Sequence, residues 1–296
     1  MNTNEHCLSL LDECEHLRKK TLFCFVFDII FASIFGVGGF ALILVAAILD
    51  FDPSYLKGLL VGLGFASFLG GTTIFVLLAI RHKNHYLDHF ESAFAPLLAK
   101  GHYDDYHFIF AKPLSILQKQ VLLPLKDKAD EDATSYSEGK LKSIAFFAFA
   151  YDHMKAKDGH PDNANGLYVE LSLPEAKEAE ILLRSKKGKK MFSLPELKES
   201  FESESIVFNA DYLLSANSQL LALQVVTPAF IDGVNRLASE EGGHLSLYLK
   251  GNRLVVYFDD YPAPEFLLAR SLKEKDLSAF ERQVLLPKKI IEALHL

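Results

Sequence analysis

Two long apolar segments near the start of the chain constrain its fold more than any other feature. Residues 22–49 are apolar apart from Asp28 and small polar side chains, and residues 58–80 contain no charged side chain. A helix of about 20 residues crosses a hydrocarbon layer ~30 Å thick. Each segment is long enough to span a membrane, so the sequence predicts a two-helix transmembrane hairpin with spans at 21–49 and 58–80.

The charges around the two spans predict their orientation. The linking residues 50–57 include the helix breaker Pro53, so we expect a tight antiparallel turn. The first apolar run is far longer than the ~15-residue core of a signal peptide, so cleavage is not expected. By the positive-inside rule both termini face the cytoplasm, which predicts a two-span protein of the cell (inner) membrane. Basic residues flank the hairpin and acidic residues dominate the turn: Arg18, Lys19, Lys20, Arg81 and Lys83 against Asp50, Asp52 and Lys57.

Asp28 is the only charged residue inside the first apolar run. Residues 30–49 suffice to cross the hydrocarbon layer, which places Asp28 in the headgroup zone. The alternative is a position near the bilayer centre, where a carboxylate costs roughly 2.5–3.5 kcal/mol and marks a functional site. We predict the headgroup position.

The second run contains five glycines between Gly58 and Gly71, and its core comes within one residue of the dinucleotide-binding pattern G-x-G-x-x-G. That pattern requires a preceding strand and a helix that opens at the third glycine. Here the glycines lie inside an apolar span, so a nucleotide site is not expected.

Small residues instead recur at every fourth position of this run. A small-xxx-small face lets two helix backbones approach closely in a membrane. We predict packing within the hairpin as the first choice and a homodimer seam as the second, with Gly64 on the opposite face and less sensitive to substitution. The predicted helix-packing residues are Gly58, Gly62, Ala66 and Gly70, with Ala32, Gly36 and Gly39 as the counterpart on the first span.

The part of the chain after the hairpin is acidic and lacks cysteine. Residues 84–296 carry 25 Lys and Arg against 31 Asp and Glu. A negative charge disfavours sequence-independent nucleic-acid binding, which needs clustered cations, so no nucleic-acid partner is expected. Cys7, Cys14 and Cys24 all precede or lie in the first span, which leaves no disulfide framework for the soluble part.

Residues 81–99 continue with helical spacing and predict a stalk helix. His82, His85 and His89 lie on one side of it, and the last two have the i, i+4 spacing that many metal sites use. No further ligand completes a site nearby. We therefore predict solvated or interface histidines and no metal.

Residues 100–265 predict a cytoplasmic α+β domain with mostly antiparallel strands. Residues 139–154 and 166–174 have strand patterns on either side of a turn-rich loop. The loop residues Asp158, His160, Asp162 and Asn165 do not have the order of a calcium loop, so a plain hairpin loop is expected.

The next segment contains the one concentrated basic patch of the soluble domain. Residues 180–194 are read as two short strands joined by a basic tip, followed by a helix with Ser193 as N-cap and Pro195 in its first turn. The tip is either a solvated hairpin or a contact for anionic lipid headgroups. The candidate lipid-contact residues are Lys186, Lys187, Lys189 and Lys190.

The last third has the clearest local signals. Thr227 and Pro228 begin a predicted helix that ends at Gly242 and Gly243. A β-hairpin is predicted next, with strands at 245–249 and 254–258 and a turn at 250–253. Residues 266–296 are expected to form a helical C-terminal tail. The apolar face of the first helix consists of Phe230, Ile231, Val234 and Leu237.

A series of short motifs follows the two apolar segments: "EGK" at 138, "GLYVEL" at 166, "LPELKESF" at 194, "FNAD" at 208, "VVTPAFIDGVNRL" at 225 and "LSLYLKGNRLVVYF" at 245. Their order over residues 20–265 resembles the bacterial family called domain of unknown function 3137 (DUF3137), with Val226 in place of the leucine of its "LTP" helix. The resemblance implies an integral membrane protein and supplies no catalytic residues.

Known catalytic patterns are missing from the sequence. It contains no G-x-S-x-G elbow, zinc motif or P-loop, and the soluble domain has no cysteine nucleophile. We therefore predict no catalytic residue, cofactor or metal, and a membrane-anchored interaction or scaffold protein whose partners are the bilayer and a second copy or another membrane protein. The alternatives are a lipid or small-ligand sensor and, less favoured, an enzyme acting on membrane or envelope components.

Overall fold

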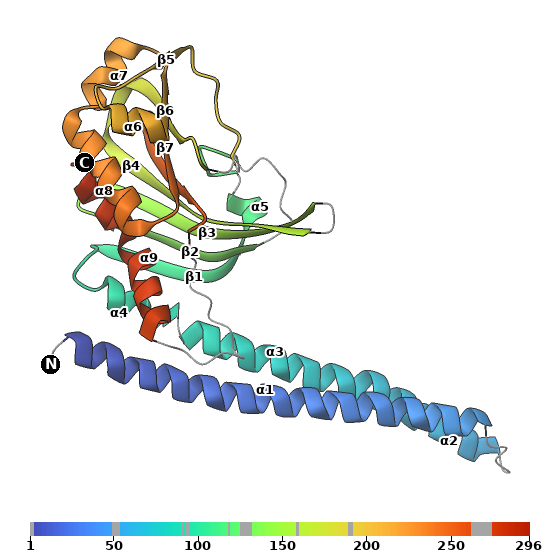
Figure 1. Cartoon of the computed structure of the whole chain (residues 1–296). Helices are drawn as coiled ribbons and strands as arrows, with labels where there is room; N and C mark the ends of the chain where they lie inside the picture. The colour runs from blue at the N-terminus through green and yellow to red at the C-terminus, as the bar shows by residue number, and fades with distance from the viewer. Residues whose placement is uncertain are drawn as a thin grey trace. The chain divides into compact units, whose positions relative to one another are not determined.

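A computed structural model of the whole chain describes residues 3–48, 54–89, 91–92, 95–117, 119–124, 132–157, 160–188, 192–261 and 274–296. The chain divides into two compact units (Figure 1). The first comprises Met1–Phe90 and Phe266–Glu274, and the second comprises Glu91–Glu265 and Lys275–Leu296.

The first unit is a pair of long helices that lie side by side (Figure 1). One is α1 (Thr3–Ile48). The other consists of α2 (Ser54–Phe65), a π-helical turn η1 (Ala66–Gly71) and α3 (Thr72–His89). The predicted helical hairpin is therefore present, and the π turn, which the sequence did not indicate, lies in the glycine-rich segment.

Two helical stretches of the described residues, Asp12–Ile48 and Leu56–Asp88, are long and apolar enough to cross a membrane. The predicted stalk helix, 81–99, is only half correct. Its first part continues α3 to His89, whereas its second part is a separate helix α4 (Ala95–Ala99) in the second unit. Pro96 is the second residue of α4, a first-turn position where proline is tolerated, so it opens a helix and does not interrupt one.

The glycines that let the two long helices approach are not those of the predicted stripe. A Cβ on Gly39 would lie 2.6 Å from the Gly64 carbonyl oxygen, and one on Gly64 would lie 2.7 Å from Ile43 Cγ1. A Cβ on Gly71 would lie 2.7 Å from the Phe35 ring. The helices therefore meet at positions where no side chain fits.

The predicted stripe of Gly58, Gly62, Ala66 and Gly70 is wrong as the packing surface of the hairpin. A Cβ on any of its three glycines would meet nothing within 4 Å, and Ala66 is exposed. The counterpart on α1 is correct, because Ala32 and Gly39 are buried and Gly36 faces Thr72. Hydroxyls line this seam: Ser67 donates to the Phe35 carbonyl at 3.2 Å and Thr72 to the Ala32 carbonyl at 3.4 Å.

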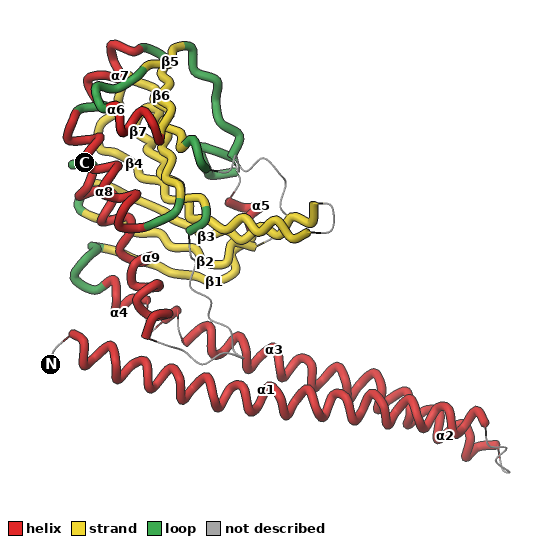
Figure 2. Tube along the Cα trace, viewed as in Figure 1, coloured by secondary structure: helices red, strands yellow, loops and turns green. Residues whose placement is uncertain are grey.

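The second unit is built on a seven-stranded antiparallel sheet, shown in yellow in Figure 2. The strand order is β1-β2-β3-β4-β6-β5, and β7 pairs with β4. β4 is the longest strand, with 26 residues, and pairs with three others. The strands are β1 (Asp105–Pro113), β2 (Asp132–Leu141), β3 (Ile144–Lys157), β4 (His160–Ser185), β5 (Glu199–Phe201), β6 (Tyr212–Ala216) and β7 (His244–Asp259).

Helices cover one face of this sheet (Figure 1). Alternate residues of β4, such as Leu167, Val169 and Leu171, pack on that face with side chains from α7, α8 and α9. On the opposite face, aromatic residues including Phe149, Tyr168 and Phe192 form a second cluster. The helices on the first face are α6 (Ile206–Asp211), α7 (Gln219–Val225), α8 (Pro228–Glu241) and α9 (Glu274–Ala293). The short helix α5 (Leu114–Leu117) contributes Leu117 to the second cluster.

Helix α8 forms as the sequence predicted. The Thr227 hydroxyl accepts a hydrogen bond from the Phe230 amide, and Pro228 occupies the first turn. Gly242 and Gly243 follow the helix at φ values of +73° and +74°, which favour glycine. The predicted apolar face of Phe230, Ile231, Val234 and Leu237 is buried.

The predicted hairpin at 245–258 is wrong, because β7 is one strand paired with β4 along its length. Leu245, Leu247 and Leu249 face the helices at odd positions, while Leu254, Val256 and Phe258 do so at even positions. The phase changes at Gly251, where φ is +60° and the register to β4 shifts. The turn-like pattern therefore falls where the pairing with β4 is irregular.

The segment after β4 also differs from its prediction. Among the described residues, Ser185 ends β4, Phe192 makes a single bridge, and 193–197 are irregular, so the second strand of the basic hairpin and the helix capped by Ser193 do not form. Their place is taken by the short strand β5. Phe192 inserts among Tyr151, Tyr168 and Tyr257, and this contact overrides the local helix-start signal.

The predicted C-terminal helix is present as α9, but it belongs to the α+β unit. Leu286 and Ile290 lie in the core beneath the sheet. A Cβ on Gly233 of α8 would lie 2.1 Å from the Ala293 carbonyl oxygen, so glycine is required where α8 meets the end of α9. Residues 275–296 therefore complete the core and are not a tail.

The loop whose residues were compared with a calcium-binding loop belongs to the β3–β4 hairpin. The two strands pair up to Lys157 and His160. His160, Asp162 and Asn165 lie in β4, and Asp158 lies outside the described residues. The prediction of a hairpin is confirmed, but the first predicted strand, 139–154, includes the end of β2 and the turn before β3, and the second, 166–174, is only part of β4.

Candidate functional site

The predicted basic tip is partly neutralised by α6. Lys186 Nζ donates to the Asn209 carbonyl at 2.6 Å, and Lys187 Nζ lies 2.9 Å from the Asp211 carboxylate. Cations are favourable at the carbonyl end of a helix. Lys189 and Lys190 lie outside the described residues. In the described part, the two lysines therefore stabilise the end of a helix.

The histidines of the predicted stalk do not form a metal site among the described residues. His82 Nδ1 lies 2.8 Å from the Asp28 carboxylate, which is buried, and His85 is exposed. His82 directly follows Arg81, the first cation after the second apolar run. The pair ties α1 to α3 at the end of that run.

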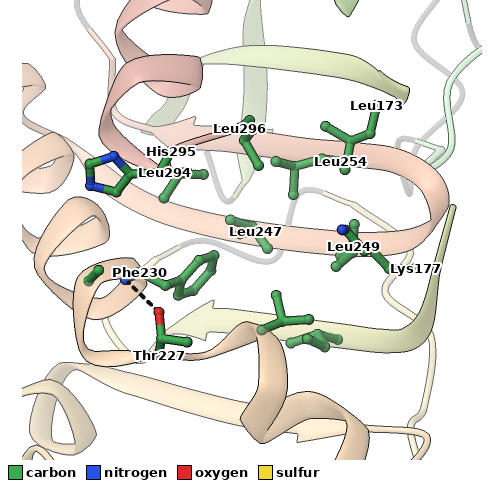
Figure 3. Close-up of a pocket in the computed structure, with 13 residues that line it drawn as sticks. Leu173, Lys177, Thr227, Phe230, Leu247, Leu249, Leu254, Leu294, His295 and Leu296 are labelled. Carbon is green, nitrogen blue, oxygen red and sulfur yellow. Dashed lines mark hydrogen bonds between the residues drawn. The ribbon is translucent and has the colours of Figure 1, made fainter. Parts of the chain in front are cut away.

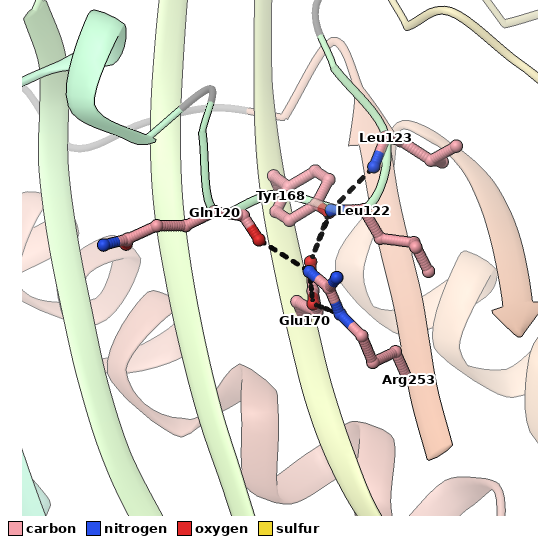
Figure 4. A network of polar contacts seen from close by, with 6 residues as sticks. All are labelled: Gln120, Leu122, Leu123, Tyr168, Glu170 and Arg253. Carbon is pink, nitrogen blue, oxygen red and sulfur yellow. Dashed lines mark hydrogen bonds and ion pairs between the residues drawn. The ribbon is translucent and has the colours of Figure 1, made fainter. Parts of the chain in front are cut away.

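A buried polar network lies on the aromatic face of the sheet (Figure 4). The Tyr168 hydroxyl donates to Glu170 at 2.6 Å, and Arg253 forms an ion pair with the same carboxylate. Glu170 also accepts from the Leu122 amide at 3.1 Å, and Arg253 donates to the Gln120 carbonyl at 2.6 Å.

This network has a structural role. Burial raises the pKa of the Tyr168 phenol far above its usual range, and the nearby Glu170 carboxylate adds to the effect. The phenol therefore stays protonated and serves as a donor, not as a nucleophile. The bonds from the Leu122 amide to Glu170 and from Arg253 to the Gln120 carbonyl hold residues 120–122 against the sheet.

Among the described residues of the second unit, the three most exposed large apolar side chains lie on α6 and α7. Ile206 and Val207 are 85% and 74% exposed, and Leu220 and Leu223 are 74% and 45% exposed. α6 turns Phe208 into the core and α7 turns Ala222 inward, so the neighbouring aliphatic residues point to solvent. We call these four residues the α6–α7 surface.

A hollow of about 450 Å³ adjoins the α6–α7 surface. Leu223 of α7 and Ser205, the residue before Ile206, both line it, so the ends of both helices border the hollow. The hydroxyls of Ser205 and Thr227 cap α6 and α8 and are engaged by the Phe208 and Phe230 amides. The full lining is Ser203, Glu204, Ser205, Leu223, Val226, Thr227, Pro228, Ile231 and Asp232.

The charge at this hollow is negative. Glu204 and Asp232 both line it, and no Lys or Arg does so. Glu199 and Glu202, on the segment leading to α6, are exposed. The sequence did not indicate this site, because isoleucine and valine in a short helix are expected to be buried.

No protein-family model matches the chain, and no curated protein matches it significantly. Among solved structures, the chain is similar to the crystal structure of the mycobacterial trehalose monomycolate transport factor A, TtfA, with 13% identity and a TM-score of 0.36. The similarity covers 67% of this chain and 93% of that chain. At this level it carries no argument about function.

Proposed function

We propose that the protein is a membrane-anchored interaction module. The paired apolar helices anchor it in the inner membrane with both termini in the cytoplasm, and the α+β unit presents the α6–α7 surface to a partner. The basic residues outside both apolar runs support this orientation. The Asp28–His82 pair next to Arg81 supports a headgroup position for Asp28.

The α6–α7 surface is the observation that carries the proposal. Isolated exposed apolar residues are ordinary, but several of them on two helices that border one hollow are typical of an interaction site. The carboxylates of Glu204 and Asp232 repel an anionic lipid surface. The two carboxylates complement a basic, amphipathic segment of a protein partner. The aliphatic side chains of that segment would pack against Leu220 and Leu223.

A photo-crosslinking amino acid placed at Leu220 tests this proposal in intact cells. We expect a discrete protein adduct, and mass spectrometry of its crosslinked peptide should identify a segment with apolar and basic residues on opposite faces. The matched control carries the same amino acid at Ser239, which is exposed on α8 and away from the hollow. The same adducts from both positions, or none from Leu220, would overturn the proposal.

Charge reversal separates specific docking from general adhesion. Glu204→Lys in the Leu220 crosslinking background should remove the adduct, because it opposes a basic partner. Lys198→Glu, on an exposed residue outside the hollow, should leave it unchanged. If neither substitution changes the yield of the Leu220 adduct, a basic partner is excluded.

The family assignment and self-association are further proposals. The order of motifs supports membership of DUF3137. The face formed by Gly58, Gly62, Ala66 and Gly70 supports a homodimer seam, because its glycines do not contact α1. Gly62→Leu should then reduce crosslinking between two differently tagged copies in native membranes.

A further inference from the structure

An apolar cavity of about 220 Å³ lies between the sheet and the start of α8 (Figure 3). It is separate from the α6–α7 surface and does not depend on the function proposed for it. The register between β4 and β7 shifts on both sides of the Lys177–Gly251 pair. These irregularities occur where the two strands border the cavity.

The walls of the cavity are almost entirely aliphatic. Figure 3 shows Leu247, Leu249 and Leu254 of β7 on one side and Phe230 of α8 on another. The Thr227 hydroxyl is already engaged by the Phe230 amide, so it is not directed at a guest. An apolar cavity of ~150 Å³ stays dry and binds benzene. The larger cavity here suits an alkyl chain of several carbons better than water.

Two nitrogen-bearing side chains lie at opposite ends of the cavity, Lys177 and His295 (Figure 3). The Lys177 ammonium lies 3.9 Å from the Glu175 carboxylate, and the Glu175 side chain is 83% exposed. Such an exposed ion pair contributes little and is easily exchanged. Among the described residues that line the cavity there is no Asp or Glu, and Lys177 is the one Lys or Arg.

We propose that this cavity binds the alkyl chain of an anionic amphiphile, with the acid head of that molecule at Lys177. Burial of the chain against leucine side chains supplies the affinity. A charge-assisted hydrogen bond from the lysine ammonium selects an anionic head. Access is available at Ala229 and Leu296, which line the cavity and are exposed.

The test uses the full chain in zwitterionic lipid nanodiscs and follows thermal unfolding of the sheet by circular dichroism. A ligand of the folded state raises Tm by mass action. Octanoate and octyl phosphate should raise Tm, whereas acetate and octyltrimethylammonium should not. The two acid probes distinguish a carboxylate head from a phosphate head, and a response to either supports the proposal.

Two variants with matched controls locate the binding. Ala229→Trp plugs the mouth of the cavity and should abolish the shift, while Asn235→Trp, on an exposed position of the same helix, should retain it. Lys177→Glu should weaken octanoate binding roughly tenfold or more and should create a response to octyltrimethylammonium. Lys198→Glu should bind octanoate as the natural chain does.

Equal octanoate shifts in the natural chain and in Ala229→Trp would place binding outside the cavity and overturn the proposal. Equal responses to octanoate and octyltrimethylammonium in the natural chain would overturn the role of Lys177. A Lys177→Glu variant that responds to octyltrimethylammonium must be folded. A variant that is simply unfolded would respond to neither ligand and could not be mistaken for this result.

Discussion

At the scale of single residues, the structure reverses which glycine of the hairpin matters. The four-residue spacing of Gly58, Gly62, Ala66 and Gly70 favoured that face, yet Gly64 makes the close approach to Gly39 and Ile43. A Cβ at Gly64 would lie 2.8 Å from the Gly39 carbonyl oxygen, which is backbone and cannot rotate away. Spacing identifies a small face but not the partner that it meets.

We therefore expect Gly64→Leu to destabilise the helical pair by about 1–3 kcal/mol or more, the usual cost of overpacking. Gly62→Leu should cost little in a monomer, because its Cβ would meet nothing within 4 Å. Unfolding of the detergent-solubilised protein in sodium dodecyl sulfate, followed by helical circular dichroism, measures both. A larger loss for Gly62→Leu would contradict the observed seam.

At the scale of elements, β7 shows how one residue decides between a hairpin and a continuous strand. The buried apolar residues stand at odd positions before Gly251 and at even positions after Arg253, as two strands joined by a turn would show. β4 pairs with both halves, and its register to β7 shifts on either side of the Lys177–Gly251 pair, where the apolar side chains of β7 change phase. Local patterns therefore identified the strands but not what they pair with.

Gly251 adopts a φ of +60° with no atom near its missing Cβ, so only backbone strain opposes a side chain there. Gly251→Val should cost about 1–2 kcal/mol, the penalty of a left-handed conformation, whereas Gly251→Asn should cost clearly less. Urea unfolding of the nanodisc-embedded chain, read from the β signal, compares them. Equal losses would mean that side-chain volume, not φ, limits this position.

At the scale of the whole molecule, the proposed orientation in the membrane rests on the charges around the hairpin. In a chain whose three cysteines are replaced by alanine, Lys57→Cys should react with a membrane-impermeant thiol reagent in intact cells. Ser239→Cys, exposed on α8, should react only after the cells are opened. The reverse pattern would place the α+β unit outside.

The sequence by itself determined the features that depend on neighbours along the chain. The apolar runs, the Thr227 cap, Pro228 and the glycines after α8 each specify their local structure through length, dihedral angle or a nearby hydrogen bond. The resulting helices, most strand segments and the α+β class could be predicted. The sequence did not indicate that Lys186 and Lys187 of the basic tip contact α6.

Only the tertiary structure decided which faces meet. It paired Gly39 with Gly64, aligned both halves of β7 with β4 and packed α9 into the core. It also exposed Ile206 and Leu220 while burying Phe208, and left a cavity where β4 and β7 shift register. These outcomes depend on contacts between residues far apart in the chain, whose packing energies outweigh the local preferences that a sequence pattern records.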